Sequence, residues 1–183
     1  MPLSVAVQMD PIDAININAD STFRIVEEAQ ARGHSLFWYT PDQLVYENGR
    51  VLANGHPVTL RREQGNHATN GPWQTVDLAE VDVVWLRQDP PFDMSYITST
   101  HLLDMLQGKT LVVNDPFWVR NYPEKLLVLR YADLTPPTMI ARDLLSLRDF
   151  KDRHGDIILK PLYGNGGAGV FRLGHSDSNL NAL

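Results

Sequence analysis

The 183-residue chain has the composition of a globular protein, and its charge and cysteine content restrict its function. It contains 22 acidic and 16 basic residues, which gives a formal net charge of -6 at pH 7. Nucleic-acid-binding domains usually carry a basic face, so we expect a small-molecule partner and no nucleic acid. The absence of cysteine excludes disulfides, thiolate zinc sites and a cysteine nucleophile.

The length fits one ordinary domain plus part of a second, at roughly 150 residues per domain. The N-terminal segment lacks the basic region of a secretory signal. No apolar run approaches the roughly 20 residues that a membrane span needs. We therefore expect a cytoplasmic protein with no membrane partner.

The N-terminal third has the pattern of a strand, a helix and a second strand. Apolar and small or polar residues alternate over 3–9, as in a strand. Asp20 and Ser21 can cap a helix that stops at Gly33, and 36–39 form an apolar run. This order predicts a βαβ unit, whose two strands are parallel.

Turn residues dominate the next segment. Asn48-Gly49 and Asn54-Gly55 separate short apolar runs, which predicts a small antiparallel meander over 44–60. The polar stretch 61–74 is rich in glycine and asparagine, so we expect a loop there.

Two further apolar runs, 83–86 and 111–113, are separated by a predicted helix over 94–106. The alternation of strands and helices predicts an α/β fold with a doubly wound parallel sheet. We place the end of this N-terminal domain, residues 1–122, near Tyr122.

A second, incomplete domain is expected over 123–183. The sequence predicts a helix over 124–131, a strand over 138–140 and a helix over 144–154 that ends at Gly155. A β-branched strand then leads to Lys160.

A glycine-rich loop, 164–169, follows Lys160 and precedes a short apolar run over 170–173. Such a loop presents bare N–H groups to phosphate oxygens, and the lysine supplies a mobile positive charge. Phosphoryl transfer also needs metal-binding carboxylates, and Asp177 is the only acidic residue after Lys160. The sequence thus indicates the front part of an ATP-using enzyme.

Other nucleotide motifs match this loop less well. It fits G-x-G-x-x-G literally, but a dinucleotide fold would place a helix after it. A kinase loop has its lysine on the following strand, and a Walker A loop ends in Gly-Lys-Ser or Gly-Lys-Thr. A flexible glycine hairpin without a ligand remains the alternative interpretation.

Individual residues also have simpler interpretations. Lys160 could extend along the surface from the end of its strand, and Lys125 could be a solvated helix lysine. Arg87 and Asp89 follow a strand end, where α/β folds bind ligands, but could form a structural ion pair in a rigid loop. The six histidines show no metal-binding spacing.

Several segments together resemble the bacterial glutathione synthetase family of ATP-grasp ligases, and the resemblance covers nearly the whole chain. The most specific segments are D-P-P-F-D at 89–93 and the lysine-glycine segment 156–169. The others include M-D-P-I at 9–12, D-S-T-F at 20–23, E-K-L at 124–126 and D-L-T-P at 133–136.

The resemblance implies a pre-ATP-grasp domain followed by the first part of an ATP-grasp domain. It also implies joining of γ-glutamylcysteine to glycine with ATP and Mg²⁺, through an acyl phosphate. The residues expected to bind ATP are Lys125, Lys160, Gly164, Asn165, Gly166, Gly167, Ala168 and Gly169. One departure is Tyr163, where many members carry aspartate.

Asp10, Ser21, Arg87 and Asp89 lie in the matching segments and are expected to bind substrate. The catalytic residues stay unknown, since the resemblance puts most of them, together with the metal ligands, after Leu183. We expect no metal ligand in this chain, and a homo-oligomer as the assembly.

Two alternatives stay open at this point. The protein could be another ATP-grasp ligase that joins a carboxylate to an amine, or a non-catalytic nucleotide-binding or assembly module. The resemblance implies about 300 residues, so we expect the 183-residue chain to be truncated, inactive alone and a weak binder of ATP. We also expect exposed apolar residues after 123 to favour self-association, or disorder of the glycine loop in a monomer.

Overall fold

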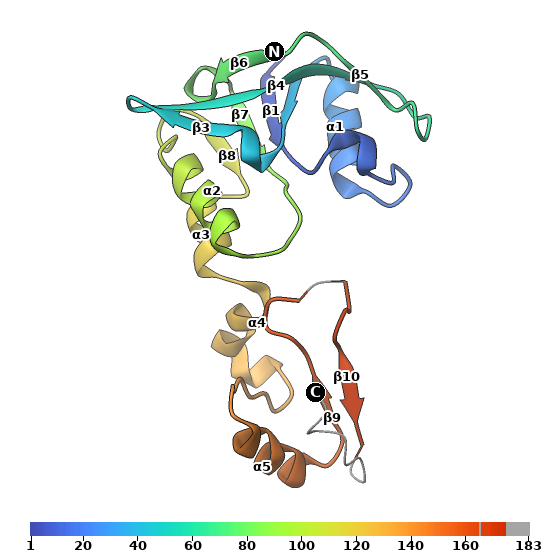
Figure 1. The fold of residues 1–183 in the computed structure, drawn as a ribbon, viewed down its shortest axis with the longest axis vertical. Coiled ribbons are helices and arrows are strands. Elements are labelled where there is room, and N and C mark those ends of the chain that lie inside the picture. Colours follow the sequence, from blue (N-terminus) through green and yellow to red (C-terminus); the bar gives the residue numbers. More distant parts are fainter. Residues whose placement is uncertain (165, 175–183) are drawn as a thin grey trace. The chain divides into compact units, whose positions relative to one another are not determined.

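The computed structural model describes residues 1–164 and 166–174, and the chain divides into two compact units, Met1–Asn121 and Tyr122–Leu183 (Figure 1). Each unit contains its own sheet.

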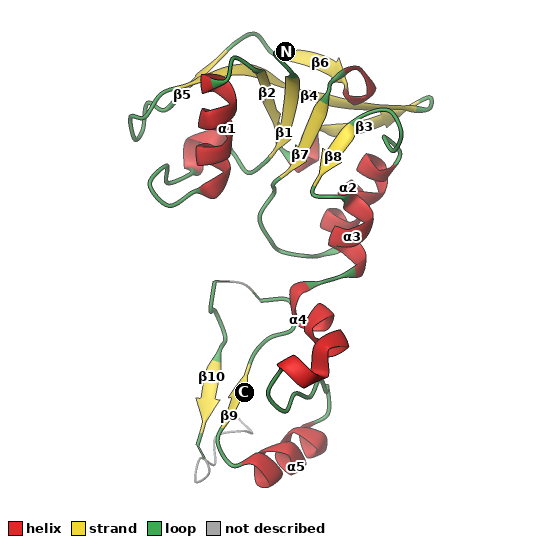
Figure 2. Ribbon diagram, turned by 180° about the vertical axis from the view of Figure 1, so that it is seen from behind, coloured by secondary structure: helices red, strands yellow, loops and turns green. Residues whose placement is uncertain are grey.

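The first unit is built on an eight-stranded sheet with the order β3-β4-β2-β1-β7-β8, in which β5 and β6 also pair with β4 (Figure 2). β1 runs parallel to β2 and β7, and β7 runs parallel to β8. β4 is antiparallel to all four of its partners. The strands are β1 (Ser4–Gln8), β2 (Ser35–Tyr39), β3 (Leu44–Glu47), β4 (Arg50–Leu60), β5 (Ala68–Asn70), β6 (Gln74–Asp77), β7 (Val83–Leu86) and β8 (Leu111–Val113).

Three α-helices belong to this unit, and local capping explains where the first begins and ends. The Asp20 carboxylate accepts a hydrogen bond from the Phe23 backbone N–H at 2.6 Å, and Gly33 follows the helix with a φ of 81°. The helices are α1 (Ser21–Ala31), α2 (Met94–Asp104) and α3 (Pro116–Asn121), with 3₁₀ turns at Ile12–Ala14, Pro41–Gln43 and Leu78–Glu80.

Each face of the sheet has its own apolar core. Val5 and Val7 of β1 pack with Phe23 and Val26 of α1 on one face. Ala6, between them in the strand, packs with Leu103 of α2 on the other face. Helices therefore cover both faces of the sheet, which confirms the predicted α/β doubly wound class.

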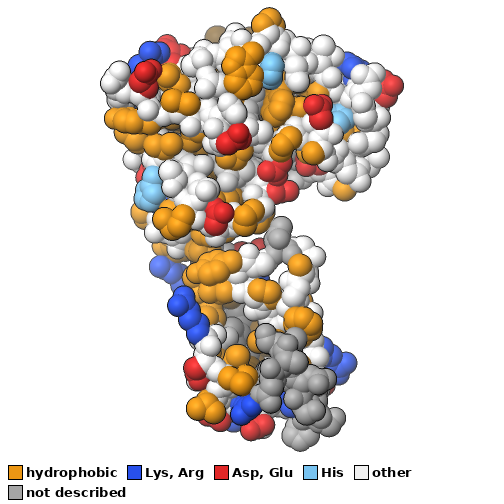
Figure 3. All heavy atoms as spheres, viewed as in Figure 1, with side chains coloured by type: hydrophobic (Ala, Val, Ile, Leu, Met, Phe, Trp, Pro, Cys, Tyr) orange, Lys and Arg blue, Asp and Glu red, His pale blue; other side chains and the backbone are white. Residues whose placement is uncertain are grey.

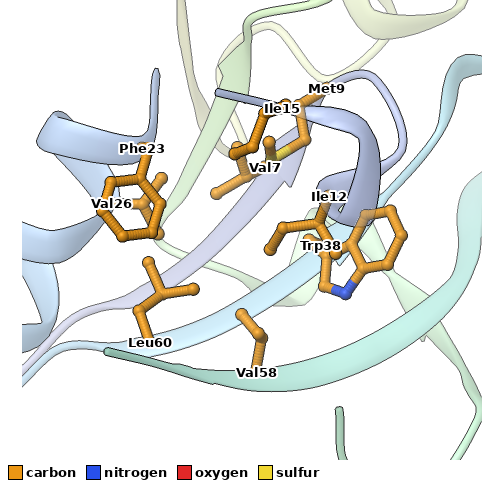
Figure 4. Close-up of a pocket in the computed structure, with 9 residues that line it drawn as sticks. All are labelled: Val7, Met9, Ile12, Ile15, Phe23, Val26, Trp38, Val58 and Leu60. Carbon is orange, nitrogen blue, oxygen red and sulfur yellow. The ribbon is translucent and has the colours of Figure 1, made fainter. Parts of the chain in front are cut away.

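A cavity of about 10 Å³ lies in the core beside α1 (Figure 4). Its lining is apolar except for the Trp38 indole nitrogen, which donates a hydrogen bond to Asn70 at 2.8 Å. A cavity without free polar partners stays dry, so it does not qualify as a site for a polar ligand. The lining residues are Val7, Met9, Ile12, Ile15, Phe23, Val26, Trp38, Val58 and Leu60.

The structure corrects two predictions in this unit. Asn54-Gly55 forms no turn, because β4 runs without interruption from Arg50 to Leu60. The glycine serves close packing instead, since a Cβ atom at Gly55 would lie 2.2 Å from the Trp38 carbonyl oxygen of β2. The predicted loop 61–74 contains β5 and the start of β6, whose polar residues pair with the open edges of β4.

The second unit consists of helices and one antiparallel hairpin. Its elements are α4 (Glu124–Leu127), a 3₁₀ helix (Val128–Leu134), α5 (Leu144–His154), β9 (Ile157–Leu159) and β10 (Phe171–Leu173). α5 begins where Asp143 caps the Ser146 N–H at 2.8 Å and ends at Gly155, as the sequence predicts. The predicted helix 124–131 is only one α-turn before the 3₁₀ helix. The predicted strand 138–140 is wrong, because no described strand pairs with it.

The core of the second unit is small. Ile157 and Leu173 are buried, with Leu147, Phe150 and Leu159 partly buried against them. α5 packs on the hairpin and covers this core. Other apolar side chains of this unit are exposed, including Leu134 at 78% and Leu145 at 70%. Figure 3 shows exposed hydrophobic side chains in orange.

Within the described part of the chain, no helix combines the length and apolar character needed to cross a membrane.

Substituting Gly55 tests the close packing of β4 on β2. We expect Gly55→Ala to lower the free energy of unfolding by about 1–3 kcal/mol or more. The new methyl group would clash with the Trp38 carbonyl oxygen, which is a backbone atom and cannot rotate away as a side chain can. Chemical denaturation of the purified chain measures this change. Gly174→Ala is the control, because its Cβ would find nothing nearer than 3.7 Å, and it should change stability by less than about 0.5 kcal/mol. Equal effects of the two substitutions would contradict the packing argument.

Candidate functional site

The first candidate cluster lies where β1 and β7 end and α1 begins. Gln8 of β1 is in register with Leu86 of β7, so the residues after both strands emerge at the same edge of the sheet. The Arg87 backbone N–H donates to the Gln8 carbonyl at 2.8 Å, which continues this pairing by one residue. Ligand groups of α/β folds gather at this edge.

The structure brings together the four residues expected to bind substrate. The Arg87 guanidinium donates from Nη2 to the Ser21 hydroxyl at 2.8 Å and from Nε to the Thr22 hydroxyl at 3.1 Å. The Asp89 backbone N–H donates to the Asp10 carboxylate at 3.2 Å. The guanidinium is thus held in place by uncharged hydroxyls, which leave its charge available.

Carboxylates are in excess around this guanidinium. Burial raises the pKa of the Asp89 carboxyl, and the nearby carboxylates of Asp10 and Asp20 raise it further, while Arg87 opposes them. Burial also raises the pKa of the Tyr96 hydroxyl, with Asp89 and Asp10 acting in the same direction and Arg87 against them. Holding several carboxylates together costs free energy, which is typical of a site that binds a positively charged group.

Sequence reasoning missed the polar residues beneath this cluster. The Gln8 side chain is fully buried, and its amide nitrogen donates to the Gln88 amide oxygen. The Gln8 amide oxygen and the hydroxyl of Tyr39, its register partner on β2, are buried without a hydrogen-bond partner in the described structure. A glutamine at the end of an apolar strand could have indicated this buried polar group. The alternating pattern of the strand hid it, because Gln8 occupies one of the positions for small or polar residues.

The second candidate cluster is the hairpin β9–β10 and its connecting loop. Phe171 pairs with Leu159 and Leu173 with Ile157, so the predicted strand-loop-strand arrangement is confirmed. A strand rather than a helix follows the glycines, which excludes the dinucleotide-binding interpretation.

The loop glycines have two different roles. Gly166, Gly167 and Gly169 have positive φ values of 59°, 78° and 70°, which favour glycine. A Cβ atom at Gly166 or Gly167 would meet nothing within 4 Å, whereas one at Gly169 would lie 2.8 Å from Pro161. The exposed backbone at Gly166, Gly167 and Ala168 is therefore open to a ligand. Asn165 lies outside the described residues.

One of the two predicted lysines contacts this loop. The Lys125 ammonium group donates to the Gly164 carbonyl oxygen at 2.5 Å and lies 3.9 Å from the Glu124 carboxylate. The contact joins α4 to a loop 39 residues later in the chain. Lys160 is exposed directly after β9, and it forms no ion pair or hydrogen bond within residues 1–164 and 166–174.

This cluster has the groups that a polyphosphate needs. Lys125 places a positive charge at the first glycine, and the exposed glycine backbone beyond it carries main-chain N–H groups that an anion could reach. Within 1–164 and 166–174, no group of three or more His, Cys, Asp or Glu side chains could hold a metal ion.

Two family models match the chain in succession. The model of the prokaryotic glutathione synthetase N-terminal domain matches residues 3–120, and that of the prokaryotic glutathione synthetase ATP-grasp domain matches residues 124–183.

Curated proteins give the same result. The chain is 56% identical to a glutathione synthetase of Brucella melitensis, 54% to one of Mesorhizobium japonicum and 38% to one of Vibrio cholerae. The alignments cover 99–100% of this chain but only 57–59% of the length of those relatives. By its sequence over both units, the chain belongs to the prokaryotic glutathione synthetase family.

Proposed function

We propose that the protein to which this chain belongs joins γ-glutamylcysteine to glycine at the expense of ATP and so produces glutathione. The observation that carries this proposal is the contact of Lys125 with Gly164 at the start of a glycine loop, in a chain of this family. The proposal includes a cytoplasmic location and a homo-oligomeric assembly.

The chemistry requires activation of a carboxylate, which is a poor electrophile. Transfer of the γ-phosphoryl group of ATP to the dipeptide carboxylate gives an acyl phosphate, and the glycine amine then displaces phosphate. Such transfers are catalysed mainly by positioning and charge neutralisation.

In this proposal the second unit binds the triphosphate. Lys125 and Lys160 neutralise phosphate charge, and the backbone N–H groups of the loop Gly164–Gly169, with Asn165 and Ala168, bind phosphate oxygens. The loop also keeps water away from the acyl phosphate. Mg²⁺ would neutralise further phosphate charge when bound, with its ligands in the part of the complete protein that follows Leu183.

In the same proposal the first unit binds the dipeptide. Arg87, held by Ser21 and Thr22, suits a carboxylate of the substrate, and the carboxylates of Asp10 and Asp89 suit its ammonium group. A γ-glutamyl group bears an ammonium group and a carboxylate group on the same carbon atom. This pair of charges matches a cluster that contains both a guanidinium group and carboxylates.

The complete gene product provides the test of the reaction. Incubated with ATP, Mg²⁺, γ-glutamylcysteine and glycine, it should form glutathione and release phosphate in equal amounts, measured by chromatography and a phosphate assay. Replacing glycine by other amines tests the alternative that the protein is a different ATP-grasp ligase. No product with any amine, despite a folded protein, would favour a non-catalytic nucleotide-binding module.

Lysine substitutions in the complete gene product test the phosphate site. We expect Lys125→Ala and Lys160→Ala each to raise the KM for ATP or lower kcat by roughly tenfold to a hundredfold, since hydrogen bonds to charged groups contribute about 1.5–3 kcal/mol. Lys109→Ala removes the same charge from an exposed turn of the first unit and should leave the kinetics unchanged. A Lys125→Ala enzyme with wild-type kinetics would remove this residue from the site.

The excess of carboxylates in the first unit predicts a pH-dependent stability. A raised pKa means that the ionised Asp89 carboxylate costs stability, and this cost appears as the pH rises from the unfolded pKa, about 3.9, through the higher folded value. Asp89→Asn should therefore raise the melting temperature at pH 7 and lose this advantage below about pH 4.

Asp82→Asn is the matched control with the opposite sign. The Asp82 carboxylate accepts from the Ser4 backbone N–H at 2.7 Å and from the Ser4 hydroxyl at 2.8 Å, which lower its pKa. The ionised Asp82 carboxylate therefore stabilises the folded state above the unfolded pKa, and this stabilisation is lost as the pH falls through the lower folded value. The substitution should lower the melting temperature at pH 7. Thermal melts that moved in the same direction for both variants would contradict the electrostatic argument.

A further inference from the structure

The first unit contains three Asn-Gly dipeptides in three different settings: Asn48-Gly49, Asn54-Gly55 and Asn70-Gly71. In such a pair the glycine backbone nitrogen can attack the side-chain amide carbon of the asparagine, because glycine has no side chain to obstruct the approach. The attack needs a free backbone N–H, a free side-chain amide and a backbone that can rotate.

Asn48-Gly49 meets these requirements. The pair forms the tip of the β3–β4 hairpin, between the paired residues Glu47 and Arg50, and both residues are exposed. Their φ values of 49° and 85° are typical of a two-residue hairpin turn. Within 1–164 and 166–174, neither the Asn48 side chain nor the Gly49 N–H has a hydrogen-bond partner.

Asn54-Gly55 is held inside the sheet. The pair belongs to β4 and is in register with Thr75 and Gln74 of β6. The Asn54 side-chain oxygen accepts from the Thr75 hydroxyl at 2.6 Å, and Gly55 is buried against β2. Rotation of this backbone would break its pairing with β6 and disturb the close approach of Gly55 to β2.

Asn70-Gly71 is held at both reacting groups. The Gly71 N–H donates to the Pro57 carbonyl oxygen at 2.7 Å, so the nitrogen is already engaged. The Asn70 side-chain oxygen accepts from the Trp38 indole N–H at 2.8 Å. Both hydrogen bonds must break before the nitrogen can reach the amide carbon.

We propose that Asn48 is a site of spontaneous deamidation in the folded protein, and that the structure protects Asn54 and Asn70. The Gly49 nitrogen loses its proton and forms a bond to the Asn48 side-chain carbon, while the bond from that carbon to the amide nitrogen breaks and ammonia leaves. Water then opens the cyclic imide at either carbonyl and yields aspartate or isoaspartate.

The product alters the hairpin in two ways. Either product adds a negative charge beside Glu47, in a chain whose formal charge is already -6. Isoaspartate also lengthens the main chain of a two-residue turn, and the length of the turn fixes the register of a hairpin. The modification therefore loosens the pairing of β3 with β4.

Peptide mapping by mass spectrometry tests the proposal. The folded protein is incubated in mildly alkaline buffer, and the gain in mass on conversion of amide to carboxyl is followed at each site. Asn48 should convert at least about tenfold faster than Asn54 and Asn70, because the latter react only when their segments open. In urea the three sites should react at similar rates, since the dipeptide is the same.

A variant isolates the reacting side chain. Asn48→Gly keeps a residue that accepts positive φ and should abolish conversion at the hairpin tip, with the protein still folded by circular dichroism. The proposal is overturned if Asn48 in the folded protein is as slow as Asn70, or if Asn54 and Asn70 convert as fast as Asn48.

Discussion

The parallel register of β1 with β7 is the constraint on which the first unit's candidate site depends. Because Gln8 lies beside Leu86, Asp10 and Arg87 leave the sheet at one edge, and the Asp89 N–H reaches Asp10. A shift of one residue would send Gln8 to the other face and replace a polar contact with an apolar one. The helix α1 contributes Ser21 to the same edge because Asp20 fixes its first turn.

The sequence was sufficient to predict the helices and strands that depend on local chemistry. α1 and α5 begin at aspartate caps and end near glycines, and the βαβ order determines a parallel sheet. The pairing of strands that are distant in the sequence was harder to predict. Asn54-Gly55 has the composition of a turn, but β2, β3 and β6 all pair with β4 through this region, and tertiary pairing overrides local preference.

The candidate site was predictable to a different extent in each unit. Glycines next to a lysine identify a loop with an open backbone from residue type alone. The contact of Lys125 with Gly164 could not be derived locally, because it joins residues 39 positions apart and the helix around Lys125 has no distinguishing pattern. Gln8 and Tyr39 were hidden for a related reason: strand periodicity identifies which face a residue occupies, but not whether a buried polar group has a partner.

The end of β1 brings together several unfavourable polar groups, in contrast to the apolar middle of the same strand. Towards the middle of β1, Ala6 and Val7 are fully buried among apolar neighbours, whereas its end carries an unpaired amide oxygen and three nearby carboxylates. A fold selected only for stability would replace these groups with apolar or paired ones, as it has throughout the rest of the strand. Their position at the edge where parallel sheets bind ligands supports the proposed dipeptide site, in which a cationic group of the substrate would offset the cost of holding the carboxylates together.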